Sequence, residues 1–156
     1  MSISFNQADS KVTLANRVAL KSFIEKRVKK EGFSIETLTY VFCSDKYLLK
    51  MNKDFLSHNY YTDIISFDLS ETPGNLIGEV YISVDRVKDN AKTHGTSLKE
   101  ELHRVIFHGA LHFCGYKDKK PADTIKMRKM EDRWLNAYMK PQNCSTWNKR
   151  TRRSVR

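Results

Sequence analysis

The sequence predicts an α+β fold, a small mixed β-sheet of about four strands covered by helices. Short segments rich in β-branched and aromatic residues alternate with longer segments whose apolar residues have helical spacing. A chain of 156 residues suffices for one buried core and leaves no room for two ordinary domains. We therefore expect a single domain over residues 1–140 and a basic, disordered tail over residues 141–156.

Four segments have the composition of strands. Residues 3–6 are a short candidate, and residues 35–43 are rich in β-branched and aromatic side chains. Residues 62–69 and 76–83 are separated by a loop in which Pro-Gly favours a type II turn. The last two strands are therefore expected to form a hairpin.

Two helices are predicted in the N-terminal half. The first covers residues 13–31 and ends at Gly32, a common helix stop. The second covers residues 45–55, with Asp45 as its N-cap. The apolar residues expected on their buried faces are Leu14, Val18, Phe23, Ile24 and Val28 in the first and Leu48, Met51 and Phe55 in the second.

Three further helices are predicted in the C-terminal half. Ser83 and Gly95 bracket one of them, and Ser97 with Glu100 forms a capping box that opens the next. The last covers residues 121–139. Its apolar stripe, interpreted as core, is Met127, Met130, Trp134 and Tyr138.

The helix that opens at Ser97 carries two histidines, His108 and His112, at a spacing that suits a metal ion. A four-residue step places both imidazoles on one helix face, one turn apart. Two histidines chelate one metal in this way on the helix of zinc proteases. The other three histidines are not predicted ligands, since His58 and His94 are expected at the surface and His103 lies off the ligand face.

Asp118 is the candidate for a third ligand. Gly115 can take the left-handed conformation that ends a helix, and the chain can then fold back toward the histidines. Asp118 could instead cap the helix that begins near Pro121. Three protein ligands leave one position open, as in catalytic zinc sites, so we expect one zinc ion on His108, His112 and Asp118.

The residue after the first histidine separates this pattern from that of a protease. Zinc proteases carry a glutamate there, which serves as general base. Here the position is Gly109, which has no side chain. The sequence therefore predicts metal-assisted attack by water on a substrate other than a peptide, with the general base unassigned. A zincin-like metalloprotease or another metallohydrolase remains the alternative.

The segment HGALHFCGYKD at residues 108–118 resembles the signature of the YbeY family, metal-dependent endoribonucleases of ribosomal RNA maturation, whose motif reads HGxLHLxGYDH. Residues 62–67, TDIISF, resemble the TDVLSF strand of that family. The resemblance extends from about Met51 to Tyr138. The motif is matched at His108, Gly109, Leu111, His112, Gly115 and Tyr116.

This resemblance implies a single-strand-specific, zinc-dependent endoribonuclease. It would act in 3′-end maturation of small-subunit (16S) ribosomal RNA and in ribosome quality control, with ribosomal RNA and the ribosome or its small subunit as partners. Two positions depart from the family, because Asp118 stands where histidine is usual and Leu56 where arginine is usual. A non-catalytic ribosome assembly factor is therefore kept as a further alternative.

The charge of the chain fits a polyanionic partner. Its 28 basic and 18 acidic residues give a formal net charge of +10. The tail contributes five basic residues and no acid, and it is either a solvated end or a basic arm that attracts phosphates. These basic residues are Lys149, Arg150, Arg152, Arg153 and Arg156.

The cysteines and the hydropathy pattern predict a reduced, cytoplasmic protein. Cys43, Cys114 and Cys144 are odd in number and lack the spacing of a disulfide framework. The sequence has no apolar run long enough to cross a membrane and no signal-peptide pattern. We therefore expect neither a disulfide-linked partner nor a membrane, and Cys114 is interpreted as a small buried apolar residue.

Overall fold

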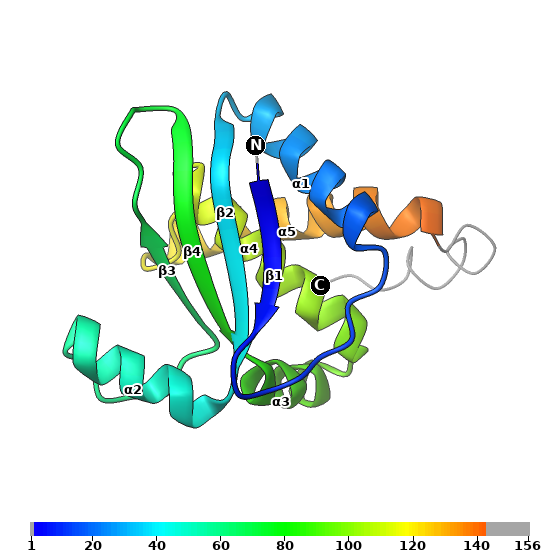
Figure 1. Cartoon of the computed structure of the whole chain (residues 1–156). Coiled ribbons are helices and arrows are strands. Elements are labelled where there is room, and N and C mark those ends of the chain that lie inside the picture. The colour runs from blue at the N-terminus through cyan, green and yellow to red at the C-terminus, as the bar shows by residue number, and fades with distance from the viewer. Residues whose placement is uncertain (1, 143–156) are drawn as a thin grey trace.

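The computed structural model describes residues 2–142 and contains a four-stranded mixed sheet with helices on both of its faces (Figure 1). The strand order is β1-β2-β4-β3, with β1, β2 and β4 parallel and β3 antiparallel to β4. The predicted α+β class and the predicted hairpin are therefore confirmed. The strands are β1 (Ser2–Gln7), β2 (Ser34–Cys43), β3 (Ile64–Asp68) and β4 (Asn75–Ser83).

The turn that joins β3 to β4 has the geometry that its sequence predicts. Gly74 has a φ of 83°, the positive value that the third residue of a type II turn requires. The amide of Asn75 donates to the carbonyl of Thr72 over 3.1 Å, which closes the turn.

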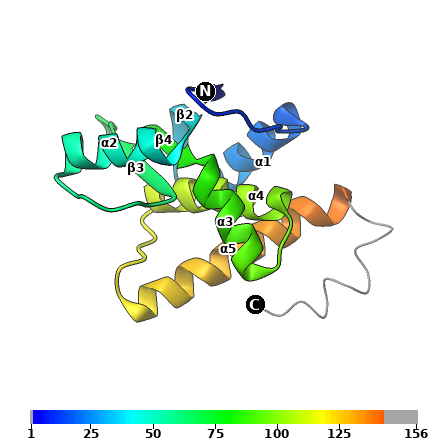
Figure 2. The ribbon, with the colours of Figure 1, turned by 90° about the horizontal axis from the view of Figure 1, so that it is seen from below.

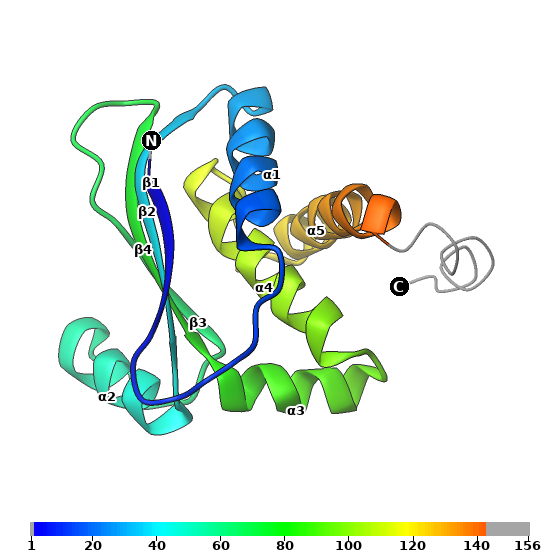
Figure 3. The same ribbon diagram turned by 45° about the vertical axis from the view of Figure 1, so that its right-hand side comes forward.

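Within the described residues five helices surround this sheet, and three of them cover one face. Figure 3, in which the sheet is seen nearly edge-on, shows α1, α4 and α5 on one side and α2 on the other. The view from below agrees that α4 lies between the sheet and α5 (Figure 2). Because α4 is enclosed in this way, even its polar residues Glu101 and Arg104 are buried. The helices are α1 (Arg17–Lys30), α2 (Asp45–Leu56), α3 (Val84–His94), α4 (Leu98–Phe113) and α5 (Pro121–Gln142).

Three of the predicted helix ends are found where the sequence places them. The Ser83 side chain accepts from the backbone of Arg86 at the start of α3, and Gly95 ends that helix in the left-handed conformation. The Ser97 side chain accepts from the amide of Glu100 and opens α4. The stripe of α5 is buried as predicted, at Met127, Met130, Trp134 and Tyr138.

The first helix starts four residues later than predicted, at Arg17 instead of Thr13. Val12 and Leu14 are buried and alternate with exposed residues in a segment without regular secondary structure, so their burial has a period of two and not that of a helix. Val18 was expected to face the core, and it is 83% exposed. The buried residues of α1 are Leu20, Ile24 and Val28.

The N-cap predicted for α2 is also wrong by one residue. Ser44 caps this helix by accepting from the amide of Tyr47. Asp45 instead accepts hydrogen bonds from the side chains of Ser83 and Arg86, which join α2 to α3. Phe55 was expected on the buried face with Leu48 and Met51, and it is 68% exposed, with its ring in an edge contact with Phe67.

The remaining expectations concern the cysteines, the membrane and the tail. Cys43 and Cys114 are free thiols, and Cys114 is partly rather than fully buried. Within residues 2–142, none of the helices is long and apolar enough to cross a bilayer. The helix α5 continues to Gln142, and the rest of the predicted tail, residues 143–156 with Cys144, lies outside the described residues.

Candidate metal centre

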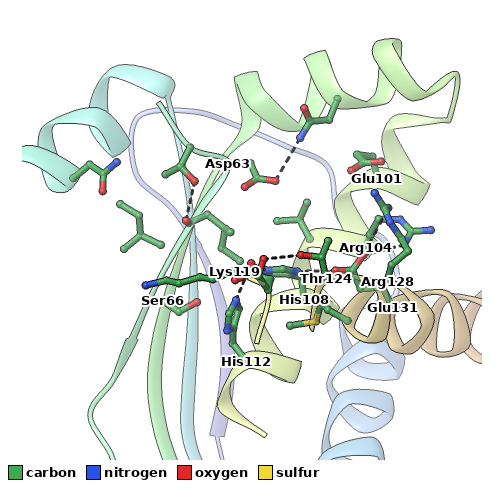
Figure 4. Close-up of a pocket in the computed structure, with 18 of the residues that line it drawn as sticks. Asp63, Ser66, Glu101, Arg104, His108, His112, Lys119, Thr124, Arg128 and Glu131 are labelled. Carbon is green, nitrogen blue, oxygen red and sulfur yellow. Dashed lines mark hydrogen bonds and ion pairs between the residues drawn. The ribbon is translucent and has the colours of Figure 1, made fainter. Parts of the chain in front are cut away.

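Three residues that lie one turn apart on α4 face the same cavity, namely Arg104, His108 and His112 (Figure 4). Their spacing of four residues places them on one face of the helix. Contacts on other faces fix how the helix is turned, because the buried hydroxyl of Tyr40 in β2 donates to the carbonyl of Ile106 over 2.9 Å. The face with the two histidines is therefore the one that remains open.

Gly109 shows why the protease base has no place in this arrangement. A Cβ atom added there would lie 3.1 Å from Cγ1 of Val80 and 3.3 Å from Cδ1 of Ile64. A side chain at this position would therefore press against the sheet instead of entering the cavity. The geometry disfavours the zincin-like metalloprotease that the histidine spacing alone allows.

The chain turns back after α4 at the glycine predicted to do so. Gly115 has a φ of 96°, and the amides of Gly115 and Tyr116 donate to the carbonyls of His112 and Leu111. The hydroxyl of Tyr116 then donates to Glu31 on α1 over 2.9 Å and holds the returning segment. Both contacts direct the following residues toward the histidines.

Asp118 reaches both histidines. Its Oδ2 atom lies 3.2 Å from Nε2 of His108 and 3.3 Å from Nε2 of His112. Potential ligand atoms of the three residues all lie within 4.8 Å of one another, which is close enough for one ion to bind all three. His108, His112 and Asp118, the three residues chosen from the sequence, could therefore hold a metal ion together. The Asp118 carbonyl also accepts from the hydroxyl of Thr124, which fixes the backbone of the loop at the start of α5.

Glu131 on α5 orients the His108 ring through the nitrogen that does not face Asp118. Its Oε2 atom lies 2.6 Å from Nδ1 of His108. An ionised carboxylate only accepts hydrogen bonds, so this nitrogen carries the hydrogen and Nε2 is left to bind a metal. The second oxygen of Glu131 accepts from Arg104 over 2.9 Å, and Arg104 also donates to Asp132 over 2.6 Å.

This arrangement shifts the pKa values of the groups in opposite directions. Burial alone would lower the pKa of His108, but the hydrogen bond and the charge of Glu131 raise it above its usual value. Burial and the neighbouring His108 lower the pKa of His112. Burial alone would raise the pKa of Glu131, but its bonds to His108 and Arg104 hold it below the usual value, so Glu131 is ionised.

Glu131 and Arg104 were not predicted from the sequence, although each carries a signal. Arg104 precedes His108 by four residues and therefore shares its helix face. Glu131 is an acid on the buried side of α5, beside Met127, Met130 and Trp134. A buried acid is rare unless it is paired, so its position indicates a partner on the facing helix.

The candidate ligands lie in a cavity of about 780 Å³. The end of α2, with Leu56, and the segment between α2 and β3, with His58 and Tyr60, form part of its lining. Lys119 and Arg128 also line the cavity, and Figure 4 shows them on opposite sides of His108. The lining of the cavity therefore combines a candidate metal group, cationic side chains, and apolar and aromatic side chains.

Asp63, at the entrance to β3, is another acid in this cavity that the sequence did not single out as a site residue. Asn90 donates to its carboxylate over 3.4 Å. Burial raises the pKa of Asp63, and the nearby charges of Glu101 and Glu131 add to this effect, while His108 opposes it. A carboxyl group of this kind accepts a proton more readily than an exposed aspartate does.

The other histidines are placed largely as predicted. His58 and His94 are exposed, and both also line the cavity. His103 is buried off the ligand face, and its ring stacks on Tyr138 with the centroids 5.4 Å apart. None of the three belongs to the candidate ligand group.

Comparisons with known proteins agree with the resemblance seen in the signature. The family model described as Endoribonuclease YbeY matches residues 2–139. A relative of that name from Cytophaga hutchinsonii is 49% identical over 134 residues, 86% of this chain and 94% of the relative. Another from Flavobacterium johnsoniae is 45% identical over 131 residues, 83% and 92% of the two chains. The solution structure of a Thermotoga maritima protein has the same fold, with a TM-score of 0.61 at 21% identity, over 92% of this chain and 93% of that one.

Proposed function

Because the chain belongs to the YbeY family of endoribonucleases, we propose that it is a zinc-dependent enzyme that cleaves single-stranded RNA in 3′-end maturation of small-subunit (16S) ribosomal RNA and in ribosome quality control. Family membership supports the coarser statement, that the chain is an RNA-cleaving hydrolase of ribosomal RNA processing. The zinc ion, the site of cleavage, the association with the small ribosomal subunit and the cytoplasmic location are the proposal.

The proposal rests on one observation: the three candidate metal ligands lie in a cavity that is also lined by exposed basic side chains. His108, His112 and Asp118 would hold the ion, and their donor set of two imidazoles and one carboxylate is one that zinc accepts. When bound, the ion supplies positive charge that polarises a phosphoryl oxygen or activates a water molecule. Glu131 keeps His108 turned with Nε2 toward the ligand group.

The cavity offers cations for the phosphate although the usual arginine is absent. Leu56 lines the cavity at the position where arginine is usual, so it gives no charge there. Arg104 also lines it, but Glu131 and Asp132 already accept its hydrogen bonds. Among the described lining residues, Lys119 and Arg128 are the partly or fully exposed lysine and arginine side chains, and we assign them the role of binding the phosphodiester.

The function is tested by offering the zinc-loaded protein two kinds of substrate. We expect cleavage of a single-stranded ribosomal RNA fragment, much less cleavage of a duplex of the same sequence, and none of casein. Cleavage of casein in place of RNA would favour the metalloprotease. Binding to the small ribosomal subunit without cleavage of any RNA would favour the assembly factor.

Replacing Lys119 or Arg128 with methionine should slow RNA cleavage. A hydrogen bond to a charged group contributes roughly 1.5–3 kcal/mol, so we expect kcat/KM to fall about tenfold or more for each variant. Lys129→Met is the matched control, because Lys129 lies beside Arg128 on the same helix, is exposed, and does not line the cavity.

The control removes the same charge, so any general attraction of RNA to a basic protein is reduced equally. Steady-state cleavage at two salt concentrations separates the local effect from the general one. If Lys129→Met slows cleavage as much as Arg128→Met, the cavity cations have no role beyond net charge.

A further inference from the structure

The lining of the cavity includes two aromatic rings on a loop. His58 and Tyr60 lie between α2 and β3, and both line the cavity and are exposed, Tyr60 by 55%. Their rings are stacked, with centroids 5.0 Å apart and planes inclined by 20°. The Tyr60 hydroxyl lies 2.9 Å from Nδ1 of His58, so a hydrogen bond also joins the two side chains.

The rings are held in place by a residue beneath the loop. Asn52 on α2 is buried, with 2% of its surface exposed, and its side-chain amide donates to the carbonyl of Tyr60 over 2.8 Å. The backbone of Asn52 accepts from the amide of His58 over 3.0 Å. One buried residue therefore fixes both members of the stacked pair, which leaves the rings exposed but already arranged for a ligand.

The surroundings of the rings indicate what they would bind. Leu56 adds an apolar side chain to this lining, whereas Lys119 and Arg128 supply charge to it. A nucleic acid strand presents phosphates on one side and flat apolar bases on the other. The rings, the cations and the ligand group all line one cavity, so a strand whose phosphate binds the cations would bring its bases into the same cavity as the rings.

We propose that His58 and Tyr60 form a stacking surface for an unpaired nucleobase of the RNA substrate. The proposal rests on the proposed function and adds to it the physical basis of a preference for single strands. In a duplex each base is already stacked between its neighbours, so its face is not free. In a single strand the face of every base is available, and stacking on an aromatic side chain is tolerant of sequence.

The test compares two neighbouring tyrosines of almost equal exposure. Tyr60→Leu removes the ring that lines the cavity, and Tyr61→Leu removes one that is 53% exposed but does not line it. Affinity is measured with a single-stranded oligoribonucleotide that carries a fluorescent purine analogue, and with a duplex of the same sequence. A chelator is present so that the RNA is not cleaved.

We expect Tyr60→Leu to weaken binding of the single strand by roughly 5- to 100-fold, the range for one lost stacking contact. Duplex binding should stay the same, and Tyr61→Leu should bind both RNAs like the parent. The parent should also quench the purine analogue, and Tyr60→Leu should not. Tyr60→Trp provides a second variant that keeps a stacking ring, and it should bind the single strand at least as tightly as the parent.

Three outcomes would overturn the proposal. The first is that Tyr60→Leu and Tyr61→Leu lose the same amount of affinity for the single strand. The second is that Tyr60→Leu loses as much affinity for the duplex as for the single strand. The third is that Tyr60→Leu binds RNA like the parent but binds a ribosomal protein more weakly. A parent that cleaves no RNA but shows the expected Tyr60 effect would refute the proposed function and leave the stacking surface standing. If the parent cleaves RNA and Tyr60→Leu binds RNA as tightly as the parent does, the stacking surface is refuted and the proposed function stands.

Discussion

Replacing His112 with alanine is expected to remove the metal ion and RNA cleavage together. His112 is one of three candidate ligands, and two remaining protein groups hold zinc far less well than three. The loss of affinity should exceed the roughly 10- to 100-fold caused by removing a hydrogen-bond partner behind a ligand. Metal content of the purified variant, measured by elemental analysis, and cleavage of single-stranded RNA are the two readouts.

Variants of Asp118, the candidate third ligand, and of His94, a nearby histidine, complete this series. Asp118→Ala should also lose metal, whereas Asp118→His restores the side chain usual in the family and should keep it. His94→Ala removes an imidazole that lines the same cavity outside the candidate group, and the ion should remain bound. If Asp118→Ala contains as much metal as the parent, the aspartate is not a ligand.

Replacing Arg104 with leucine should destabilise the fold more than breaking any exposed ion pair. The side chains of Arg104 and Glu131 are 4% and 7% exposed, so the variant leaves a buried carboxylate without the arginine that compensates its charge. Removing one partner of a buried pair costs about 3–5 kcal/mol. We expect a loss of this size in the free energy of unfolding, measured in urea with a chelator present.

Arg86→Leu is the control, because it also removes an arginine from a carboxylate, here Asp45. The Arg86 side chain is 37% exposed, so water can solvate the carboxylate once the arginine is gone, and we expect a much smaller loss of stability than for Arg104→Leu. Adding Glu131→Gln to Arg104→Leu should recover part of the stability, since the stranded charge is then removed. If Arg104→Leu is as stable as Arg86→Leu, the buried pair contributes no more to the free energy of unfolding than the exposed pair does.

The proximity of the three candidate ligands was predictable because their positions depend on local geometry. A helix repeat places His108 and His112 together, and a glycine with positive φ is enough to turn Asp118 back. The family signature supplied the function, since the spacing alone also fits proteases.

The site residues that were not predicted from the sequence depend on contacts between segments that are distant along the chain. Glu131 reaches His108 from another helix 23 residues away, and no repeat in the sequence specifies that approach. The stacked pair of His58 and Tyr60 depends on Asn52, whose burial is decided by how α2 packs on the sheet. The error at Leu14 has a different cause, because a single buried apolar residue ahead of a helix fits a non-helical segment as well as the first turn of the helix.

The candidate ligands and their supports come from α4, from the loop after it and from α5, so the ion would bind where three separate segments meet. An ion that binds the folded chain and not the unfolded one stabilises the fold by mass action, by about 2.7 kcal/mol at a free concentration of one hundred times the dissociation constant. The supply of that metal in the cell would then change the fraction of the protein that is unfolded. When the metal is scarce, the chain would become a better substrate for proteases, and its abundance would fall along with its activity.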